Sequence, residues 1–144
     1  MASVTDRWGV VPRGGTDLKR ILVVEDNLDL RELLSDAMSD AGYDVSEVSN
    51  GAEALARAEE WLPDAILLDL MLPVMDGAEF LRARQDRPFL ARIPVMVLTA
   101  HPFHHRMLDG LGATLVVRKP YNLDVLLSAV EELCEGETGL DSVG

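Results

Sequence analysis

The feature that most constrains the fold is a repeated alternation between short apolar runs and amphipathic stripes, which starts at Lys19. Uninterrupted apolar runs such as 21–24 (ILVV) are typical of strands that are buried on both faces of a parallel sheet. The stripes between the runs repeat apolar residues at the i, i+3, i+4 and i+7 positions of a helix. This alternation predicts an α/β fold of five βα units. The predicted strands lie at 21–24, 45–48, 65–68, 95–98 and 115–117.

Capping and turn residues mark the predicted helix ends. Asn27 and Asn122 can cap the first and last helices, and Gly42 supplies a left-handed stop. Asn50, with Glu53 three residues later, has the arrangement of a capping box. Outside the periodic region, glycine, proline and mixed charges predict irregular chain. We therefore predict a flexible leader at 1–18, one domain at 19–135 and a flexible tail at 136–144.

Residues that can carry chemistry follow the predicted strands. Glu25 and Asp26 come directly after the first strand, and Asp69 comes directly after the third. Thr99 follows the fourth strand, and Lys119 follows the fifth. In an open parallel sheet, ligands bind outside the carboxyl ends of the strands. We therefore expect these five side chains to converge.

Such a cluster favours phosphoryl chemistry. Three neighbouring carboxylates repel one another unless a cation lies among their oxygens. Mg²⁺ suits this set, because it binds one or two carboxylates together with phosphate oxygens and keeps several waters. A carboxylate can also act as a nucleophile and form an aspartyl phosphate. A lysine and a nearby hydroxyl then stabilise the charge of the phosphoryl oxygens.

The acidic composition limits the possible partners. The 144 residues contain 13 Lys and Arg against 25 Asp and Glu, which gives a formal net charge of −12. This charge repels phosphate backbones and anionic lipids, so we expect neither direct nucleic-acid contact nor membrane binding. Cys134 is the single cysteine and has no internal partner, which suits a reducing compartment. The expected location is therefore the cytoplasm.

Five short motifs, taken in order, resemble the receiver domain of the response regulators of two-component signalling. They are ILVVEDN at 21–27, LLDLMLPVMDG at 67–77, VLTA at 97–100, GA at 112–113 and RKP at 118–120. The resemblance covers roughly the whole predicted domain. It implies a flavodoxin-like (βα)5 doubly wound sheet of five parallel strands in the order 2-1-3-4-5.

The resemblance also implies roles for the residues at the strand ends. The implied roles are phosphoacceptor for Asp69, Mg²⁺ ligands for Glu25, Asp26, Asp69 and the Met71 backbone carbonyl, and phosphoryl contacts for Thr99 and Lys119. A cis peptide bond before Pro120 is implied as well. The implied donor is a histidine kinase or a histidine phosphotransfer protein, and the implied target is an output protein that the sequence does not identify. Because few residues follow the last helix, we expect a single-domain regulator that catalyses only its own phosphorylation and dephosphorylation.

The sequence departs from the family pattern in two places. Val116 stands three residues before Lys119, where receiver domains usually carry Tyr or Phe, so the aromatic switch is absent. The segment that follows Thr99 contains Pro102 and Gly110, which limits any fourth helix to a short piece at 104–109.

Three histidines, His101, His104 and His105, lie in this same segment. A solvent-facing loop is the favoured interpretation, and a metal site formed by the histidines is the alternative. One hypothesis is that Met71 and His101, each two residues beyond a site residue, tune the lifetime of the acyl phosphate.

Three other functions compete with phosphoryl signalling. A haloacid-dehalogenase-type phosphatase needs a second acid two residues after the nucleophile, where this chain has Met71. A phosphorylation-independent interaction domain is suggested by Val116, although the site residues are intact. A nucleotide-binding Rossmann domain lacks support, because no glycine-rich loop follows the first strand.

Overall fold

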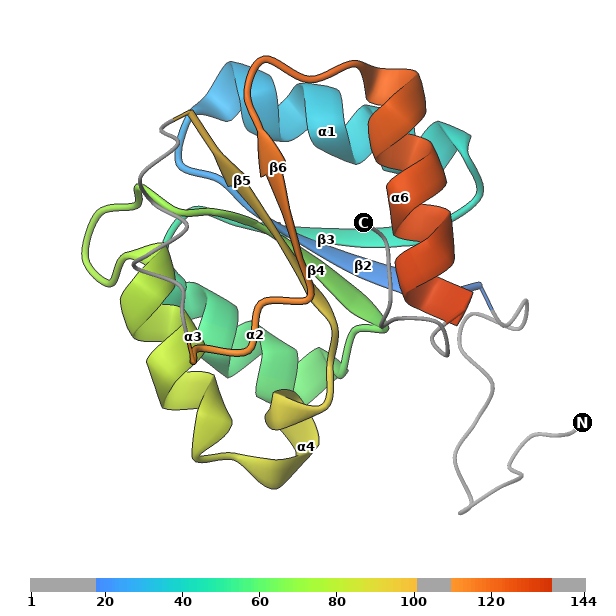
Figure 1. Cartoon of the computed structure of the whole chain (residues 1–144). Helices are drawn as coiled ribbons and strands as arrows, with labels where there is room; N and C mark the ends of the chain where they lie inside the picture. The colour runs from blue at the N-terminus through green and yellow to red at the C-terminus, as the bar shows by residue number, and fades with distance from the viewer. Residues whose placement is uncertain (1–17, 101–109, 136–144) are drawn as a thin grey trace, which may run out of the picture.

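The computed structural model describes residues 18–100 and 110–135, which form a parallel sheet between two layers of helices (Figure 1). The sheet has five strands in the order β3-β2-β4-β5-β6, and every neighbouring pair is parallel. In chain order this is 2-1-3-4-5, which confirms the predicted fold. The strands are β2 (Arg20–Val24), β3 (Asp44–Val48), β4 (Ala65–Asp69), β5 (Val95–Thr99) and β6 (Leu115–Arg118).

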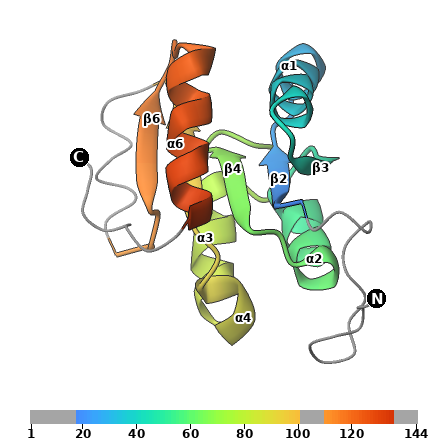
Figure 2. The ribbon, with the colours of Figure 1, turned by 90° about the vertical axis from the view of Figure 1, so that its right-hand side faces the viewer.

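The helices divide between the two faces of the sheet. One face is covered by α1 (Leu28–Asp40) and α6 (Leu123–Glu135). The other is covered by α2 (Gly51–Trp61), α3 (Gly77–Gln85) and the short α4 (Pro88–Ala91). Figure 2 shows this separation from the side.

Alternate residues of the central strands build two hydrophobic cores. In β2, Ile21 packs with Leu34 and Met38 on the α1 and α6 side, whereas Leu22 packs with Phe80 on the other side. All of these side chains are fully buried. The pattern explains why the central strands are apolar at every position, since each strand must fill both cores.

Caps fix the helix starts close to the predicted residues. The Asn27 side chain accepts a hydrogen bond from the Leu30 N–H, and Gly42 has a positive φ of 101° after α1. The Asn50 side chain accepts from the Glu53 N–H, as predicted. The rest of that capping box differs from the prediction, because the Glu53 carboxylate accepts from the N–H of Ser49, one residue before the cap.

A complete capping box lies instead at the start of α3. The Asp76 side chain accepts from the Glu79 N–H, and the Glu79 side chain accepts from the Asp76 N–H. This box fixes the point where the loop after β4 turns into the helix.

The helix α4 is not predicted by the periodicity of the sequence. It is only four residues long, and its signal is Pro88 at the first helical position, where a missing N–H is tolerated. Its position is tied to α3 through a buried side chain. The Arg84 guanidinium, with a residue exposure of 3%, donates to the carbonyl oxygens of Ile93 (2.9 Å), Ala91 (3.3 Å), Leu111 (3.5 Å) and Gly112 (3.5 Å).

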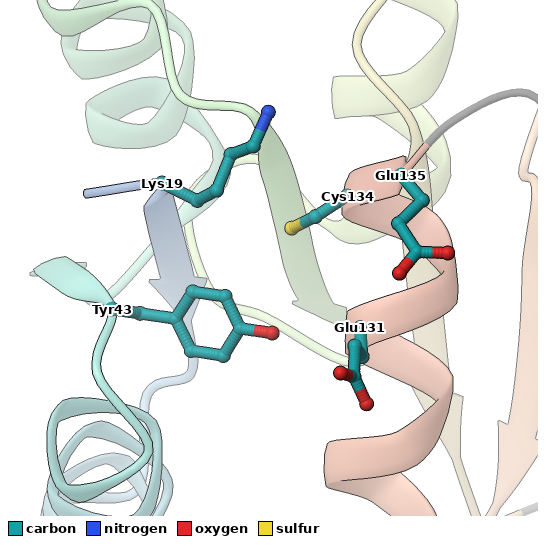
Figure 3. Close-up of a pocket in the computed structure, with 5 residues that line it drawn as sticks. All are labelled: Lys19, Tyr43, Glu131, Cys134 and Glu135. Carbon is teal, nitrogen blue, oxygen red and sulfur yellow. The ribbon is translucent and has the colours of Figure 1, made fainter. Parts of the chain in front are cut away.

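A surface pocket lies at the end of the sheet where the strands begin (Figure 3). Lys19 precedes β2 and Tyr43 precedes β3, and they face the last turns of α6. Burial raises the pKa of the Cys134 thiol in this pocket to about 11, so the thiol stays protonated at neutral pH. The pocket is therefore remote from the carboxyl ends of the strands and lacks a reactive thiolate.

Several predictions fall outside the described residues: the leader, the tail, the short fourth helix and the three histidines all lie mainly or wholly at 1–17, 101–109 or 136–144. Among the residues that the structure does describe, none of the helices has both the length and the apolar composition needed to cross a membrane.

Candidate functional site

The three predicted acids meet at the carboxyl end of the sheet. One carboxylate oxygen each from Glu25, Asp26 and Asp69 lies within 4.8 Å of the other two. Glu25 and Asp69 are only 2% and 6% exposed, whereas Asp26 faces solvent. Two buried acids and one exposed acid therefore share a small volume at the surface, where a hydrated cation can reach them.

The register of the sheet brings these acids together. Strands β2 and β4 are parallel neighbours, and Val24 pairs with Leu68, so the residues that follow them leave the sheet side by side. Backbone pairing continues past β2, because the Glu25 N–H donates to the Val48 carbonyl at 3.1 Å. The acids are thus held by the sheet rather than by a free loop.

Lys119 supplies the positive charge of the site. Its ammonium nitrogen lies 3.6 Å from Asp69 Oδ1 and 3.8 Å from Glu25 Oε1. The Lys119 backbone N–H donates to the Thr99 carbonyl at 2.7 Å, which extends the pairing of β5 with β6. The peptide bond between Lys119 and Pro120 is cis, as the resemblance implied.

Glu25 is held in an electrostatically unusual position. Burial raises the pKa of its carboxyl to about 7, and the nearby charge of Asp69 also acts to raise that pKa. The Asn27 N–H, which donates to Oε2 at 3.1 Å, and the Lys119 ammonium lower that pKa. Within the described part of the chain, Oε1 has no hydrogen-bond partner. This oxygen, whose ion-pair partner is the Lys119 ammonium at 3.8 Å, can therefore accept a hydrogen bond or bind a cation.

The remaining predicted residues lie around this cluster. Thr99 ends β5, the neighbour of β4, and is 1% exposed. The Met71 N–H donates to Asp69 Oδ1 at 3.3 Å, which places the Met71 backbone beside the phosphoacceptor candidate, while its side chain is 62% exposed. The metal contact of the Met71 carbonyl and the phosphoryl contact of Thr99 stay predictions. The position of His101 lies outside the described residues.

Two glycines allow the loop after Asp69 to pack closely. A Cβ atom at Gly77 would lie 2.8 Å from Leu70 Cα and 2.9 Å from the Asp69 carbonyl oxygen. A Cβ atom at Gly51 would lie 2.3 Å from the Met75 carbonyl oxygen. The close approach of the backbone at both glycines is visible only in the structure.

Val116 occupies the position where the family usually has an aromatic side chain. It pairs with Val97 across β5 and β6 and packs, half-buried, against the core on the α2, α3 and α4 side. An aliphatic side chain, packed against this core, therefore stands where the family usually has an aromatic one.

Tyr121 is a site residue that the sequence patterns do not single out. Its hydroxyl oxygen is buried, and among the described residues it has no hydrogen-bond partner. Burial and the charges of Glu25 and Asp69 together raise the pKa of Tyr121 to about 12. The signal for it in the sequence is only its position two residues after Lys119.

The sequence matches the family model described as "Response regulator receiver domain" over residues 21–131. The chain belongs to the response regulator receiver family. The matched range contains the three acids of the site together with Thr99, Lys119 and Tyr121. Receiver domains are signalling modules of two-component systems, and they bind Mg²⁺ in an acidic site.

Named relatives agree with this assignment. The chain is 36% identical over 118 residues to the phosphate regulon transcriptional regulatory protein PhoB of Rhizobium meliloti, covering 81% of this chain and 52% of that protein. It is 38% identical over 127 residues to the response regulator MprA of Mycolicibacterium vanbaalenii, covering 87% of this chain and 54% of that protein. The chain thus spans about half the length of the curated relatives it matches.

Solved receiver structures share the fold over most of their length. The chemotaxis response regulator CheY4 of Vibrio cholerae has a TM-score of 0.76 at 32% identity, with 81% of this chain and 98% of that chain covered. The receiver domain of the sensor histidine kinase PA1611 from Pseudomonas aeruginosa has a TM-score of 0.77 at 28% identity, with 82% and 98% covered. That kinase receiver domain has a magnesium ion coordinated in its active-site cleft.

Proposed function

We propose that this receiver domain accepts a phosphoryl group on Asp69 from a phosphohistidine of a kinase or phosphotransfer protein, in a Mg²⁺-dependent reaction. The observation that carries the proposal is the convergence of three carboxylates within 4.8 Å, with the Lys119 ammonium 3.6 Å from Asp69. The phosphorylated state then docks to an output protein.

The donor set fits Mg²⁺. The three candidate ligands are hard carboxylate oxygens, and Glu25 Oε1 is buried without a hydrogen-bond partner in the described part of the chain. The exposed carboxylate of Asp26 leaves one side of the cluster open to water, which Mg²⁺ retains when it binds. We assign Glu25, Asp26, Asp69 and the Met71 carbonyl as the residues that hold the ion. When bound, Mg²⁺ would offset the charge of the acids and of the phosphoryl oxygens.

The chain's own residues account for the transfer. A carboxylate oxygen of Asp69 attacks the phosphorus, a P–O bond forms, and the P–N bond of the phosphohistidine breaks with its electron pair left on the imidazole nitrogen. The Lys119 ammonium, already beside Asp69, stabilises the negative charge on the phosphoryl oxygens. We assign to the Thr99 hydroxyl the donation of one further hydrogen bond to those oxygens.

The competing functions receive less support from the site. A dehalogenase-type phosphatase would need a second acid two residues after Asp69, and the exposed side chain there is Met71. A phosphorylation-independent docking module would not require the buried pair of acids beside Lys119, because burying charges in a small volume is costly.

The partner is proposed to be a protein. The formal charge of −12 opposes contact with a phosphate backbone. The PhoB relative is named as a transcriptional regulatory protein, but the match covers 52% of it, so that name does not assign DNA binding to the matched half. Action as a single-domain regulator likewise stays a prediction.

The test is phosphorylation by acetyl phosphate, followed by intact mass. We expect one added phosphoryl group on the parent chain with Mg²⁺, none after chelation, and none on Asp69→Asn, which keeps the side-chain shape. Asp36→Asn, at an exposed position of α1, is the matched control and should be modified like the parent. Absence of the adduct from the parent, or its persistence in Asp69→Asn, would overturn the assignment of Asp69.

The lifetime of the aspartyl phosphate offers a second measurement. The Met71 side chain is 62% exposed next to Asp69, so it can limit the approach of water to the phosphoryl group. We expect Met71→Asn and His101→Ala to change the dephosphorylation rate. Unchanged rates in both variants would refute a role for these positions.

A further inference from the structure

The backbone of Glu25 is held from two sides by neighbouring segments. Its N–H donates to the Val48 carbonyl at the end of β3, at 3.1 Å. Its carbonyl oxygen accepts a hydrogen bond from the Arg31 guanidinium of α1, at 3.0 Å. Because the backbone donor and acceptor of Glu25 are both engaged, this part of the chain can reorient only by losing a hydrogen bond. The direction in which the Glu25 and Asp26 side chains leave the sheet therefore depends on both contacts.

The Arg31 side chain is itself anchored. Its Nε donates to Glu47 Oε1 at 3.3 Å, which connects α1 to the edge strand β3. The Arg31 side chain is only 19% exposed. A guanidinium presents five N–H donors in one rigid plane, so it can bond two acceptors at once in a fixed geometry. Arg31 thus joins three segments: α1, β3 and the turn after β2 that carries two of the acids.

The charge of Arg31 does not explain its place at this turn. Glu25 and Asp26 are candidate ligands of a divalent cation, and a positive charge close to them opposes the binding of that cation. The geometry of its hydrogen bonds has the opposite effect, because it holds the ligand-bearing turn in one arrangement before the ion arrives. The two effects of Arg31 on Mg²⁺ affinity therefore differ in sign.

We propose that Arg31 is a positioning residue of the metal site: anchored by Glu47, it holds the Glu25 carbonyl and so fixes the turn from which Glu25 and Asp26 reach the cation. This inference rests on the proposed function, because it assumes that these acids hold Mg²⁺. Arg31 acts through the backbone of Glu25 and not through contact with the ion.

Loss of the guanidinium should weaken Mg²⁺ binding. Removal of the partners that orient metal ligands lowers metal affinity by about 10- to 100-fold. Arg31→Met keeps a long apolar side chain on α1 and removes all of its donors. We expect Mg²⁺ binding to weaken by about tenfold, at the lower end of that range, because the Glu25 N–H keeps its bond to Val48. If only the charge of Arg31 mattered, the same substitution would tighten Mg²⁺ binding.

A second variant separates the donor geometry from the charge. Arg31→Lys keeps the positive charge but replaces the planar set of donors with a single ammonium group. This group does not reproduce the simultaneous bonds to the Glu25 carbonyl and the Glu47 carboxylate. We expect Arg31→Lys to bind Mg²⁺ more weakly than the parent and more tightly than Arg31→Met.

Arg57 provides a matched control. Like Arg31, it is half-buried and connects a helix to β3, because its Nε donates to Ser46 Oγ at 2.8 Å. Its guanidinium also lies over the ring of Trp61, which ends α2 and is therefore far from the carboxyl ends of the strands. Arg57→Met removes the same charge and a similar link to β3. We expect this variant to bind Mg²⁺ like the parent.

The experiment is a calorimetric Mg²⁺ titration of the full chain, Arg31→Met, Arg31→Lys and Arg57→Met, with urea unfolding as a check of the fold. A second measurement is the rate of phosphorylation by acetyl phosphate at increasing Mg²⁺. Arg31→Met should need about tenfold more Mg²⁺ for its half-maximal rate but should reach the rate of the parent at saturation. A lower saturating rate would overturn the inference, because Arg31 would then act on the transfer itself.

The remaining outcomes separate this inference from the proposed function. If the parent binds Mg²⁺ and Arg31→Met binds it no more weakly than Arg57→Met does, Arg31 has no positioning role and the metal site stands. If Arg31→Met does not fold, Arg31→Lys decides: weaker Mg²⁺ binding than in the parent supports the inference, and equal binding overturns it. If the parent does not bind Mg²⁺, the metal site of the proposed function is wrong and this inference is wrong with it.

Discussion

Glu25→Gln should stabilise the metal-free protein at neutral and alkaline pH. The Glu25 side chain is 3% exposed, and its burial raises the carboxyl pKa from 4.5 to about 7. Glutamine has nearly the same shape but carries no charge, so it removes the cost of burying an ionised group. Lys119 keeps a negative neighbour in the variant, because its ammonium also lies 3.6 Å from Asp69.

The sign and size of the effect follow from proton linkage. Because the folded-state pKa is the higher one, the folded protein binds this proton more tightly than the unfolded chain does. The Glu25 carboxyl therefore does not lower the unfolding free energy below about pH 4.5, and it lowers that free energy increasingly as the pH rises to about 7. Since a shift of one pKa unit corresponds to about 1.4 kcal/mol, the full loss of unfolding free energy is about 3 kcal/mol.

The assay is urea unfolding of the parent and Glu25→Gln with a chelator, from about pH 4 to about pH 8. The difference in unfolding free energy should be near zero at the acidic end and should favour the variant by about 3 kcal/mol at the alkaline end. Other acids titrate in both proteins and cancel in this difference. Glu60→Gln, at an exposed position, is the control and should show no such trend.

Mg²⁺ should make the parent more stable to unfolding than Glu25→Gln. The ion stabilises only a folded state that holds it, so the parent should gain stability on its addition and Glu25→Gln should gain less. A difference that is constant with pH, or a variant that is less stable than the parent at about pH 8, would refute the assignment of a buried, destabilising charge to Glu25.

Three further substitutions test other parts of the structure by urea unfolding. Lys119→Met should lower the unfolding free energy of the metal-free protein by about 1–2 kcal/mol at neutral pH, because Glu25 and Asp69 lose their cation. Mg²⁺ should restore most of this loss. An unfolding free energy equal to that of the parent would contradict the prediction. Arg84→Met should lower the unfolding free energy by about 2 kcal/mol, because buried carbonyls lose their donor. Arg82→Met, at an exposed position of the same helix, is the control and should lower it little. Equal effects of the two substitutions would show that the guanidinium contacts of Arg84 are not stabilising. Gly77→Ala should lower the unfolding free energy by about 1–3 kcal/mol, because the new Cβ meets the Leu70 backbone. An unchanged unfolding free energy would mean that the loop moves to make room for the Cβ.

The cluster of site residues could be predicted because its members follow strands with a clear sequence pattern. The apolar runs before Glu25 and Asp69 are long enough and pure enough to indicate central strands, and the carboxyl ends of parallel strands meet at one edge. The caps at Asn27 and Asn50 were equally local, because a side-chain oxygen reaches an N–H three residues later.

The features that sequence patterns did not predict depend on contacts between distant segments. Arg84 donates to carbonyl acceptors that lie outside its own helix, in and after α4 and in the loop before β6. Tyr121 looks like an ordinary aromatic residue after Pro120, and only the packed sheet places its hydroxyl near the acids that come from β2 and β4.

The sequence by itself determined the α/β alternation, the strand ends and the chemical types that gather there, because periodicity and capping act over a few residues. Tertiary structure alone decided how these residues are charged and paired. The raised pKa of Glu25 requires burial by the whole fold, and the distances from Lys119 to Glu25 and Asp69 require β6 and β2 to flank β5 and β4 in one sheet. Burial and interatomic distance are properties of the packed chain, so they set the pKa values and ion pairs of the site without leaving a local signal in the sequence.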